Sequence, residues 1–216
     1  MKKIMVLTSM RTGSTWLCLL LRLGLSMNFD FAETLDDVEE IWDARKFVKA
    51  HKFTAERVFE RYPDAYVITV VRNPKGRTSS QFYFQPPFNE DRLSRILSIS
   101  LERTEQKQLN RMWKGYSSKA KPKGRKPKYL WLTFEWLKKD TVGEFDKIAK
   151  FLGFRNSKKL NKAIVDTAQR ESRMFGMIRK GRVDSWKEET FEKELNALDK
   201  YQEMYYNIVK GEKNEE

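Results

Sequence analysis

The residues from Lys3 to Leu17 join a short apolar strand to a small, hydroxyl-rich turn and an apolar helix. Gly13 allows a tight turn, and the N–H groups of Thr12 to Thr15 face outward at the helix start, where the helix dipole is positive. Such a turn binds a phosphate or sulfate group. The ATP-binding version needs a second Gly, and a Lys directly before the hydroxyl residue, and this chain has neither. The turn therefore predicts a related but different anion site.

A second apolar strand, Tyr66–Val71, ends in Arg72. In nucleoside-triphosphate hydrolases a later strand ends in an Asp that helps to hold Mg²⁺. A cation at this point repels Mg²⁺ and attracts another anionic group, which predicts a nucleotide with extra negative charge and no metal. Pro74 sets the first turn of the next helix, and Ser80 follows Arg72 by about two turns, so that both side chains can share one phosphate.

These motifs resemble those of the sulfotransferases that use 3′-phosphoadenosine 5′-phosphosulfate (PAPS), especially the soluble, cytosolic-type branch. The run Met10-Arg-Thr-Gly-Ser-Thr-Trp16 is similar to the family's loop around the 5′-phosphosulfate. The resemblance places Arg72 and Ser80 at the 3′-phosphate, with Arg179-Lys180-Gly181 near the C-terminus. Ser185-Trp-Lys187 follows that motif, much as Asp-Trp-Lys does in the family. The resemblance covers most of the chain and implies the P-loop NTPase-like sulfotransferase fold.

His51 is the only histidine of the chain. From the residues alone, a single His in an alternating segment is a structural or merely exposed residue. The resemblance implies a catalytic role, because the family has a Lys-x-His here that Lys49 and His51 match, and its His is the general base. An imidazole with an ordinary pKa of about 6.5 is largely neutral at cytoplasmic pH and accepts an alcohol proton.

The implied reaction moves a sulfuryl group from PAPS to an acceptor hydroxyl or amine and releases 3′-phosphoadenosine 5′-phosphate (PAP), without a metal. Arg11, Lys49, the loop N–H groups and the hydroxyls of Ser14 and Thr15 are expected to stabilise the charge of the leaving phosphate. Arg11 stands where the soluble family usually has Lys. Because Arg gives up a proton less readily, we expect it to stabilise charge and not to act as an acid.

Three further residues are expected around adenine. Trp16 matches the family's stacking Trp, although a core role is the alternative. Thr167 falls where a Thr contacts adenine, and an ordinary helix hydroxyl is the alternative. Phe134 replaces a Tyr near the adenine, so one hydrogen bond is missing. The full predicted cofactor site is Arg11, Thr12, Gly13, Ser14, Thr15, Trp16, Arg72, Ser80, Thr167, Arg179, Lys180 and Gly181.

Apolar runs at residues 3–8, 46–50, 66–71 and 129–133 alternate with helical segments. This order predicts a single α/β domain over residues 1–209, with a central parallel sheet flanked by helices and a frayed tail over 210–216. Thr141 and Glu144 predict a capping box that opens a helix, which Gly153 ends. Cys18 is the only cysteine, and the apolar run beside it is too short to span a bilayer. We therefore expect a soluble, cytoplasmic protein without a membrane partner.

The formal charge of +13 leaves other classes open. A nucleic-acid-binding protein is one alternative, disfavoured because the cations belong to ordered motifs and no zinc-finger or RNA-recognition signature accompanies them. A metal-dependent P-loop nucleotide or sugar kinase is another, and would want a Walker lysine and a metal carboxylate. The acceptor could be a small molecule, a saccharide or a peptide. Seven cations without an acid between Lys114 and Lys128 predict either a solvated loop or a loop that attracts an acidic acceptor.

Overall fold

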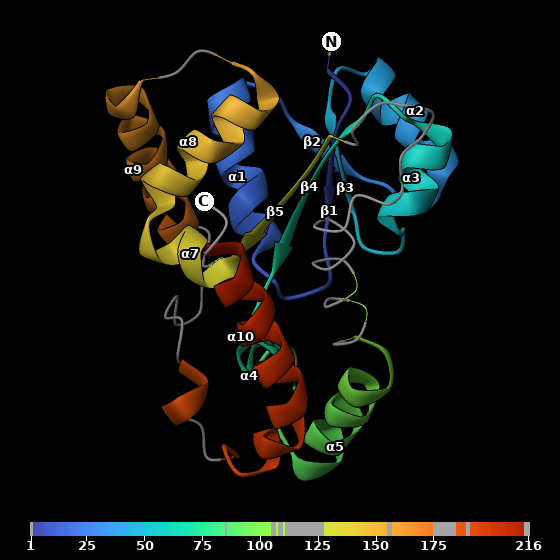
Figure 1. Ribbon diagram of the computed structural model, residues 1–216, viewed down its shortest axis with the longest axis vertical. Coiled ribbons are helices and arrows are strands. Elements are labelled where there is room, and N and C mark those ends of the chain that lie inside the picture. The colour runs from blue at the N-terminus through green and yellow to red at the C-terminus, as the bar shows by residue number, and fades with distance from the viewer. Residues whose placement is uncertain are drawn as a thin grey trace.

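A five-stranded parallel sheet lies at the centre of the computed structural model, with the strand order β2-β3-β1-β4-β5 (Figure 1). The structure describes residues 2–84, 86–104, 107, 110, 128–154, 157–174, 185–188 and 191–213. Four strands coincide with the predicted apolar runs, whereas the short edge strand β2 was not predicted. The strands are β1 (Ile4–Leu7), β2 (Phe29–Phe31), β3 (Phe47–Ala50), β4 (Tyr66–Val71) and β5 (Lys128–Thr133).

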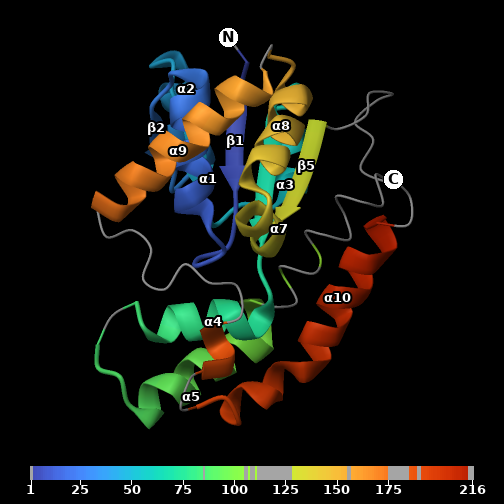
Figure 2. The ribbon, with the colours of Figure 1, turned by 90° about the vertical axis from the view of Figure 1, so that its left-hand side faces the viewer.

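Helices cover both faces of this sheet, as Figures 1 and 2 show. The helices α1, α8 and α9 pack on one face, and α2 and α3 pack on the other. The predicted α/β class is therefore confirmed. The bounds of these helices, and of the short α7 before α8, are α1 (Ser14–Leu25), α2 (Leu35–Asp43), α3 (Ala55–Arg61), α7 (Phe134–Lys139), α8 (Thr141–Leu152) and α9 (Lys158–Met174).

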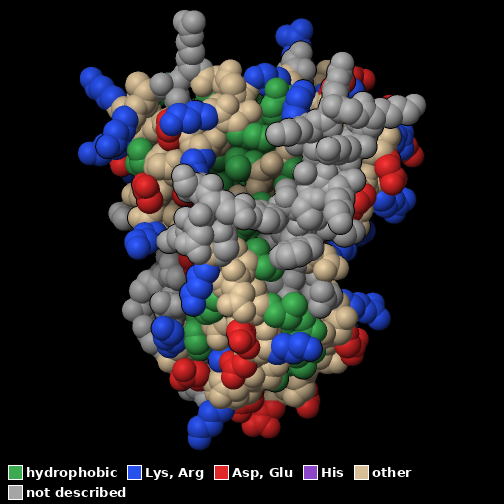
Figure 3. Space-filling model, in the orientation of Figure 1, with side chains coloured by type: hydrophobic (Ala, Val, Ile, Leu, Met, Phe, Trp, Pro, Cys, Tyr) green, Lys and Arg blue, Asp and Glu red, His purple; other side chains and the backbone are tan. Residues whose placement is uncertain are grey.

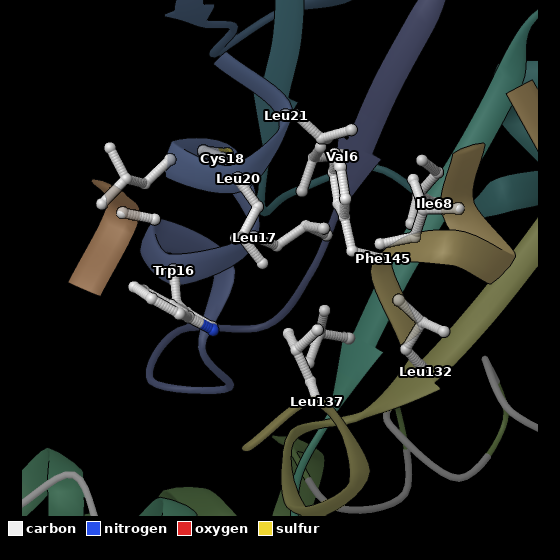
Figure 4. Packing of buried hydrophobic residues seen from close by; sticks show 14 of the residues in the cluster. Val6, Trp16, Leu17, Cys18, Leu20, Leu21, Ile68, Leu132, Leu137 and Phe145 are labelled. Carbon is white, nitrogen blue, oxygen red and sulfur yellow. The ribbon is translucent and has the colours of Figure 1, made fainter. Parts of the chain in front are cut away.

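Successive side chains of each strand point into two different cores. In β1, Val6 lies in the core under α1 and α8, whereas its neighbour Leu7 lies in the core under α2 and α3. Figure 4 shows Leu17 of α1 and Phe145 of α8 gathered with Val6 and Ile68 of the strands. Burial on both faces explains why the strands read as continuous apolar runs.

A further group of helices lies beyond the carboxyl edge of the sheet (Figure 2). It has its own apolar core, to which Phe82, Leu93, Trp186, Phe191, Leu195 and Leu198 contribute. Because β4 leads directly into α4, this group is fixed to the strand ends where ligands bind in open α/β sheets. Its elements are α4 (Pro74–Phe82), α5 (Glu90–Ile99), η1 (Ser100–Thr104), η2 (Ser185–Glu188), η3 (Glu194–Leu198) and α10 (Asp199–Lys213).

Two local predictions can be compared with the structure. The capping box at Thr141 is wrong: Asp140 caps α8 by accepting from the Gly143 N–H at 2.9 Å. The Thr141 hydroxyl instead donates to the Leu137 carbonyl at 2.7 Å, because α7 ends directly before α8 and its last carbonyls need donors. Gly153 ends α8 as predicted, at a φ of 63°. Helix α10 continues to Lys213, and residues 214–216 of the expected tail lie outside the described residues.

Candidate active site

The loop between β1 and α1 has the backbone of an anion cradle. Arg11 and Gly13 both take left-handed conformations, with φ of 64° and 95°. The Thr12 hydroxyl donates to the Ser9 carbonyl at 2.9 Å, and this hydrogen bond stabilises the turn of the loop. Gly13 is the N-cap of α1 and no side chain caps that helix end. The first-turn N–H groups, which include those of Ser14 and Thr15, are thus presented to an anion.

Gly13 is required at its position for a second reason. A Cβ built on Gly13 would lie only 2.5 Å from Cδ2 of Phe134, which follows β5 and is buried. The Phe134 ring also contacts Arg72, whose guanidinium lies 4.3 Å from the ring centroid. Phe134 therefore supports both the loop and Arg72, and this packing needs no phenolic hydroxyl.

The two predicted parts of the phosphate site meet in the structure. The Arg11 Nε donates to the Ser80 hydroxyl at 3.3 Å, and an Arg72 Nη donates to the Arg11 carbonyl at 3.3 Å. Arg11 also lies 4.4 Å from the centroid of the Phe84 ring. The loop after β1 and the segment after β4 therefore bring two guanidinium groups and a hydroxyl together at the carboxyl edge of the sheet, groups that suit the binding of phosphate.

The charge of this cluster is not balanced within it. Burial lowers the pKa of Arg72 to about 10; the Glu135 carboxylate opposes this shift, while Arg11 and Arg77 add to it. Arg72 still carries its charge at neutral pH. Burial raises the pKa of Glu135, against the hydrogen bonds that this carboxylate accepts from Tyr205 and from the Asn73 N–H. Several cations around one buried carboxylate leave the site strongly attractive to an anion.

His51 and Lys49 approach the same loop from β3. The His51 Nδ1 lies 2.8 Å from the Thr8 carbonyl, which can only accept, so Nδ1 carries the proton of the neutral ring. The lone pair of that tautomer is on Nε2, as a general base requires. The Lys49 Nζ donates to the Thr15 hydroxyl at 3.5 Å. His51 thus lies at the start of the loop, and Lys49 reaches its end.

The comparisons with known proteins agree with this geometry. A family model described as "Sulfotransferase domain" matches residues 1–210. The chain belongs to the sulfotransferase family. The fold is similar to the crystal structure of mouse sulfotransferase SULT7A1 complexed with PAP, with 17% sequence identity, a TM-score of 0.69, and coverage of 93% of this chain and 82% of that one. A search among curated protein sequences found no match.

A second similar structure is retinol dehydratase in complex with androsterone and the inactive cofactor PAP. It shares 15% sequence identity with the chain at a TM-score of 0.61, over 96% of this chain and 80% of that one. At these identities the likeness shows the fold, and the family model shows the activity class. The sulfotransferase is therefore an enzyme of sulfuryl transfer, and its residue roles rest on its own geometry.

Two residues expected around adenine, Trp16 and Thr167, make contacts in the core and within their own helix. Trp16 is buried in the core with Leu17 and Leu137 (Figure 4), and the Lys138 ammonium lies 5.2 Å from its ring centroid. The Thr167 hydroxyl donates to the Ala163 carbonyl at 2.9 Å, within its own helix. The adenine roles of Trp16 and Thr167 stay predictions.

The remaining predictions concern the motif from Arg179 to Gly181, a metal ion, a membrane helix and the surface charge. Arg179, Lys180 and Gly181 lie outside the described residues. Within the described ranges, no three His, Cys, Asp or Glu side chains gather as a metal ion would require. No helix in the described part of the sulfotransferase has both the length and the apolar character needed to cross a membrane. On the face drawn in Figure 3, Lys and Arg side chains are spread around the outline, with Asp and Glu among them.

Glu135 is a neighbour of the candidate site that the sequence did not indicate. It follows Phe134 at the end of β5 and accepts from the Asn73 N–H at 3.0 Å and from the Tyr205 hydroxyl. The Glu135 carboxylate therefore fixes the turn that carries Arg72 and links this turn to α10. An acid in the first turn of a helix is ordinary, so only its position at a strand's carboxyl end could have suggested this role.

Proposed function

We propose that the sulfotransferase takes PAPS as donor, releases PAP, and sulfates a hydroxyl (or amine) acceptor with His51 as the general base. The observation that carries this proposal is the convergence of Arg11, Arg72 and Ser80 beside a loop whose other side holds His51. A donor with a phosphate at both the 3′ and 5′ positions matches two adjoining anion sites. When bound, PAPS supplies the sulfuryl group that is transferred.

The residues of the site have three separate roles in the proposed reaction. His51 accepts the acceptor's proton at Nε2, while its Nδ1–H continues to donate to the Thr8 carbonyl. Lys49, Arg11 and the N–H groups of the first turn of α1 stabilise negative charge on the departing phosphate. Arg72 and Ser80 hold the 3′-phosphate and so fix the nucleotide in line with the acceptor.

The described rim of the site suits an acceptor with an apolar body. Three large apolar side chains are exposed next to the proposed catalytic groups: Phe31 (38%), Met10 (48%) and Phe84 (46%). The Phe31 ring centroid lies 5.2 Å from that of His51, and Phe84 lies against Arg11. Exposed aromatic rings at a site bind planar or apolar groups. We therefore propose a small, neutral acceptor, such as a phenol or an alcohol.

The alternative of an acidic acceptor rested on the cations from Lys114 to Lys128, most of which lie outside the described residues. Lys128 is described, and its ammonium lies 4.5 Å from the Tyr66 ring centroid, at the start of β4 and β5. That is the edge of the sheet opposite the site. A saccharide or an acidic peptide remains the second acceptor class to be measured.

The proposal is tested by transfer of radiolabelled sulfuryl from PAPS to a matched pair of acceptors, a neutral phenol and the same phenol carrying a carboxylate. We expect a higher kcat/KM for the neutral phenol. Phe31→Ser should raise KM for the neutral phenol about tenfold, because an apolar contact is lost beside His51. A preference for the carboxylate that declines with added salt would instead favour the acidic class, and absence of transfer to any acceptor would contradict the function.

A further inference from the structure

Trp186 lies in the short helix η2 and is 6% exposed. One side of its ring packs with Phe82, Leu93 and Phe191 in the core beyond the sheet. This packing fixes η2 against α4, the helix that begins directly after Arg72 and Asn73. Trp186 therefore brings η2, in addition to α4, next to the proposed 3′-phosphate site.

The edge of the indole that carries the nitrogen faces α4. A Cβ built on Gly76 would lie 3.5 Å from Cδ1 of Trp186 and 3.3 Å from Nε of Arg72. Cδ1 is bonded to Nε1, so the N–H edge and the Arg72 side chain meet at the same residue of α4. Gly76 stands midway between Arg72 and Ser80 in the sequence, and a Cβ there would press on the Arg72 side chain and contact the indole.

The indole N–H is buried and has no hydrogen-bond partner among the residues that the structure describes. A buried donor without a partner costs stability, so such groups need an explanation. The Lys75 and Lys187 ammonium groups lie 5.0 and 5.7 Å from the centroid of the Trp186 ring, and Lys75 is paired with Asp199 at 2.6 Å. The buried Arg72 side chain, which meets the N–H edge at Gly76, is the cation that would share an anionic acceptor with this donor.

We propose that Trp186 is a further ligand-binding residue of the sulfotransferase, whose indole N–H donates to the 3′-phosphate held by Arg72 and Ser80. This inference rests on the proposed function. It explains why the donor is buried without a partner among the described residues. It also gives η2 a role in selecting a nucleotide that carries a 3′-phosphate.

The test compares Trp186→Phe with the wild-type enzyme by calorimetry, with PAP and with AMP, which lacks the 3′-phosphate. Phe keeps an apolar ring for the core and removes the N–H donor together with part of the indole, and the AMP titration measures the effect of that lost packing. We expect PAP to bind about tenfold more weakly, a change of about 1.4 kcal/mol, and AMP to change less than about twofold. The matched control is Trp136→Phe, since Trp136 stacks on Trp131 at 6.2 Å between ring centroids and should change neither affinity.

A second measurement does not depend on the variant. The chain has six tryptophans, each with one indole N–H signal in NMR spectra of the isotope-labelled wild-type protein. One signal should shift when PAP is added and stay unchanged with AMP. Trp16, predicted to stack on the adenine that both ligands share, should respond to both.

Three results would overturn the inference. Equal losses of PAP and AMP affinity in Trp186→Phe would show that Trp186 only anchors η2, and unchanged PAP affinity would show that its N–H does not bind. Both leave the proposed function intact if the wild-type enzyme still prefers PAP. If the wild-type enzyme binds PAP and AMP equally, the 3′-phosphate site itself is wrong, and this inference fails with it.

Discussion

Replacing Gly13 with alanine should destabilise the protein through two separate effects. An L-residue at a φ of 95° is strained, which costs about 1–2 kcal/mol. The new Cβ would also lie 2.5 Å from the Phe134 ring, and relieving an overlap of this kind costs about 1–3 kcal/mol. The sum is about 2–5 kcal/mol. For a domain of this size, at about 2–4 °C per kcal/mol, it corresponds to a loss of about 4–20 °C in Tm.

Two further variants separate these effects. Gly153 also has a positive φ, of 63°, but a Cβ there would approach only the flexible end of Lys2. Gly153→Ala should therefore show the conformational cost alone, about 1–2 kcal/mol. In a Phe134→Leu background, the cost of Gly13→Ala should fall towards that value, because the overlapping ring edge is gone.

The assay is denaturant unfolding monitored by tryptophan fluorescence, followed by calorimetry with PAP for each folded variant. Gly13→Ala should weaken PAP binding further than Gly153→Ala does, because only Gly13 shapes the loop. An equal cost of Gly13→Ala with Phe or Leu at position 134 would refute a clash with the ring. Wild-type PAP affinity in Gly13→Ala would refute a role of Gly13 in shaping the anion site.

Three more outcomes are expected. His51→Asn should lower kcat about 10²–10⁴-fold and leave PAP affinity nearly unchanged in calorimetry, since the ring serves the acceptor; near-normal turnover would place the base elsewhere. Arg11→Lys should keep part of the activity that Arg11→Ala loses, and equal inactivity of both in a transfer assay would contradict a charge-stabilising role. Burial raises the pKa of the Cys18 thiol to about 12, so the thiol should resist a disulfide reagent near pH 8 until the chain is unfolded; rapid labelling of the native protein would contradict this burial.

The sequence predicted the sheet well because its strands are buried on both faces. The run Tyr66–Val71 is apolar except for Thr69 and forms β4 with the predicted bounds. Strand β2 escaped prediction, since Phe29-Asp30-Phe31 is short and its Asp interrupts the apolar run at the sheet edge. Asp140 was missed as the cap of α8 because nothing local shows that the Thr141 hydroxyl belongs to the preceding helix.

The site was predictable where its residues lie in contiguous runs. The loop from Arg11 to Trp16 and the segment from Arg72 to Ser80 carry their spacing in the sequence, so their meeting could be expected. The contacts of Glu135 and Trp186 near Arg72 could not be expected, although Trp186 lies in a motif that the sequence shows, because each comes from a distant part of the chain. Their partners are set by how β5, α4 and η2 pack.

The most direct test of the account is the affinity of the wild-type protein for PAP, AMP and Mg·ATP, measured by calorimetry under one set of conditions. Arg72 and Ser80 offer two hydrogen bonds to a 3′-phosphate, one of them from a buried cation. At about 1.5–3 kcal/mol for each charge-assisted contact, PAP should bind at least about 100-fold more tightly than AMP. The same preference should hold against Mg·ATP and disappear in Arg72→Ala. Equal affinities for PAP and AMP, or tighter binding of Mg·ATP, would contradict the account.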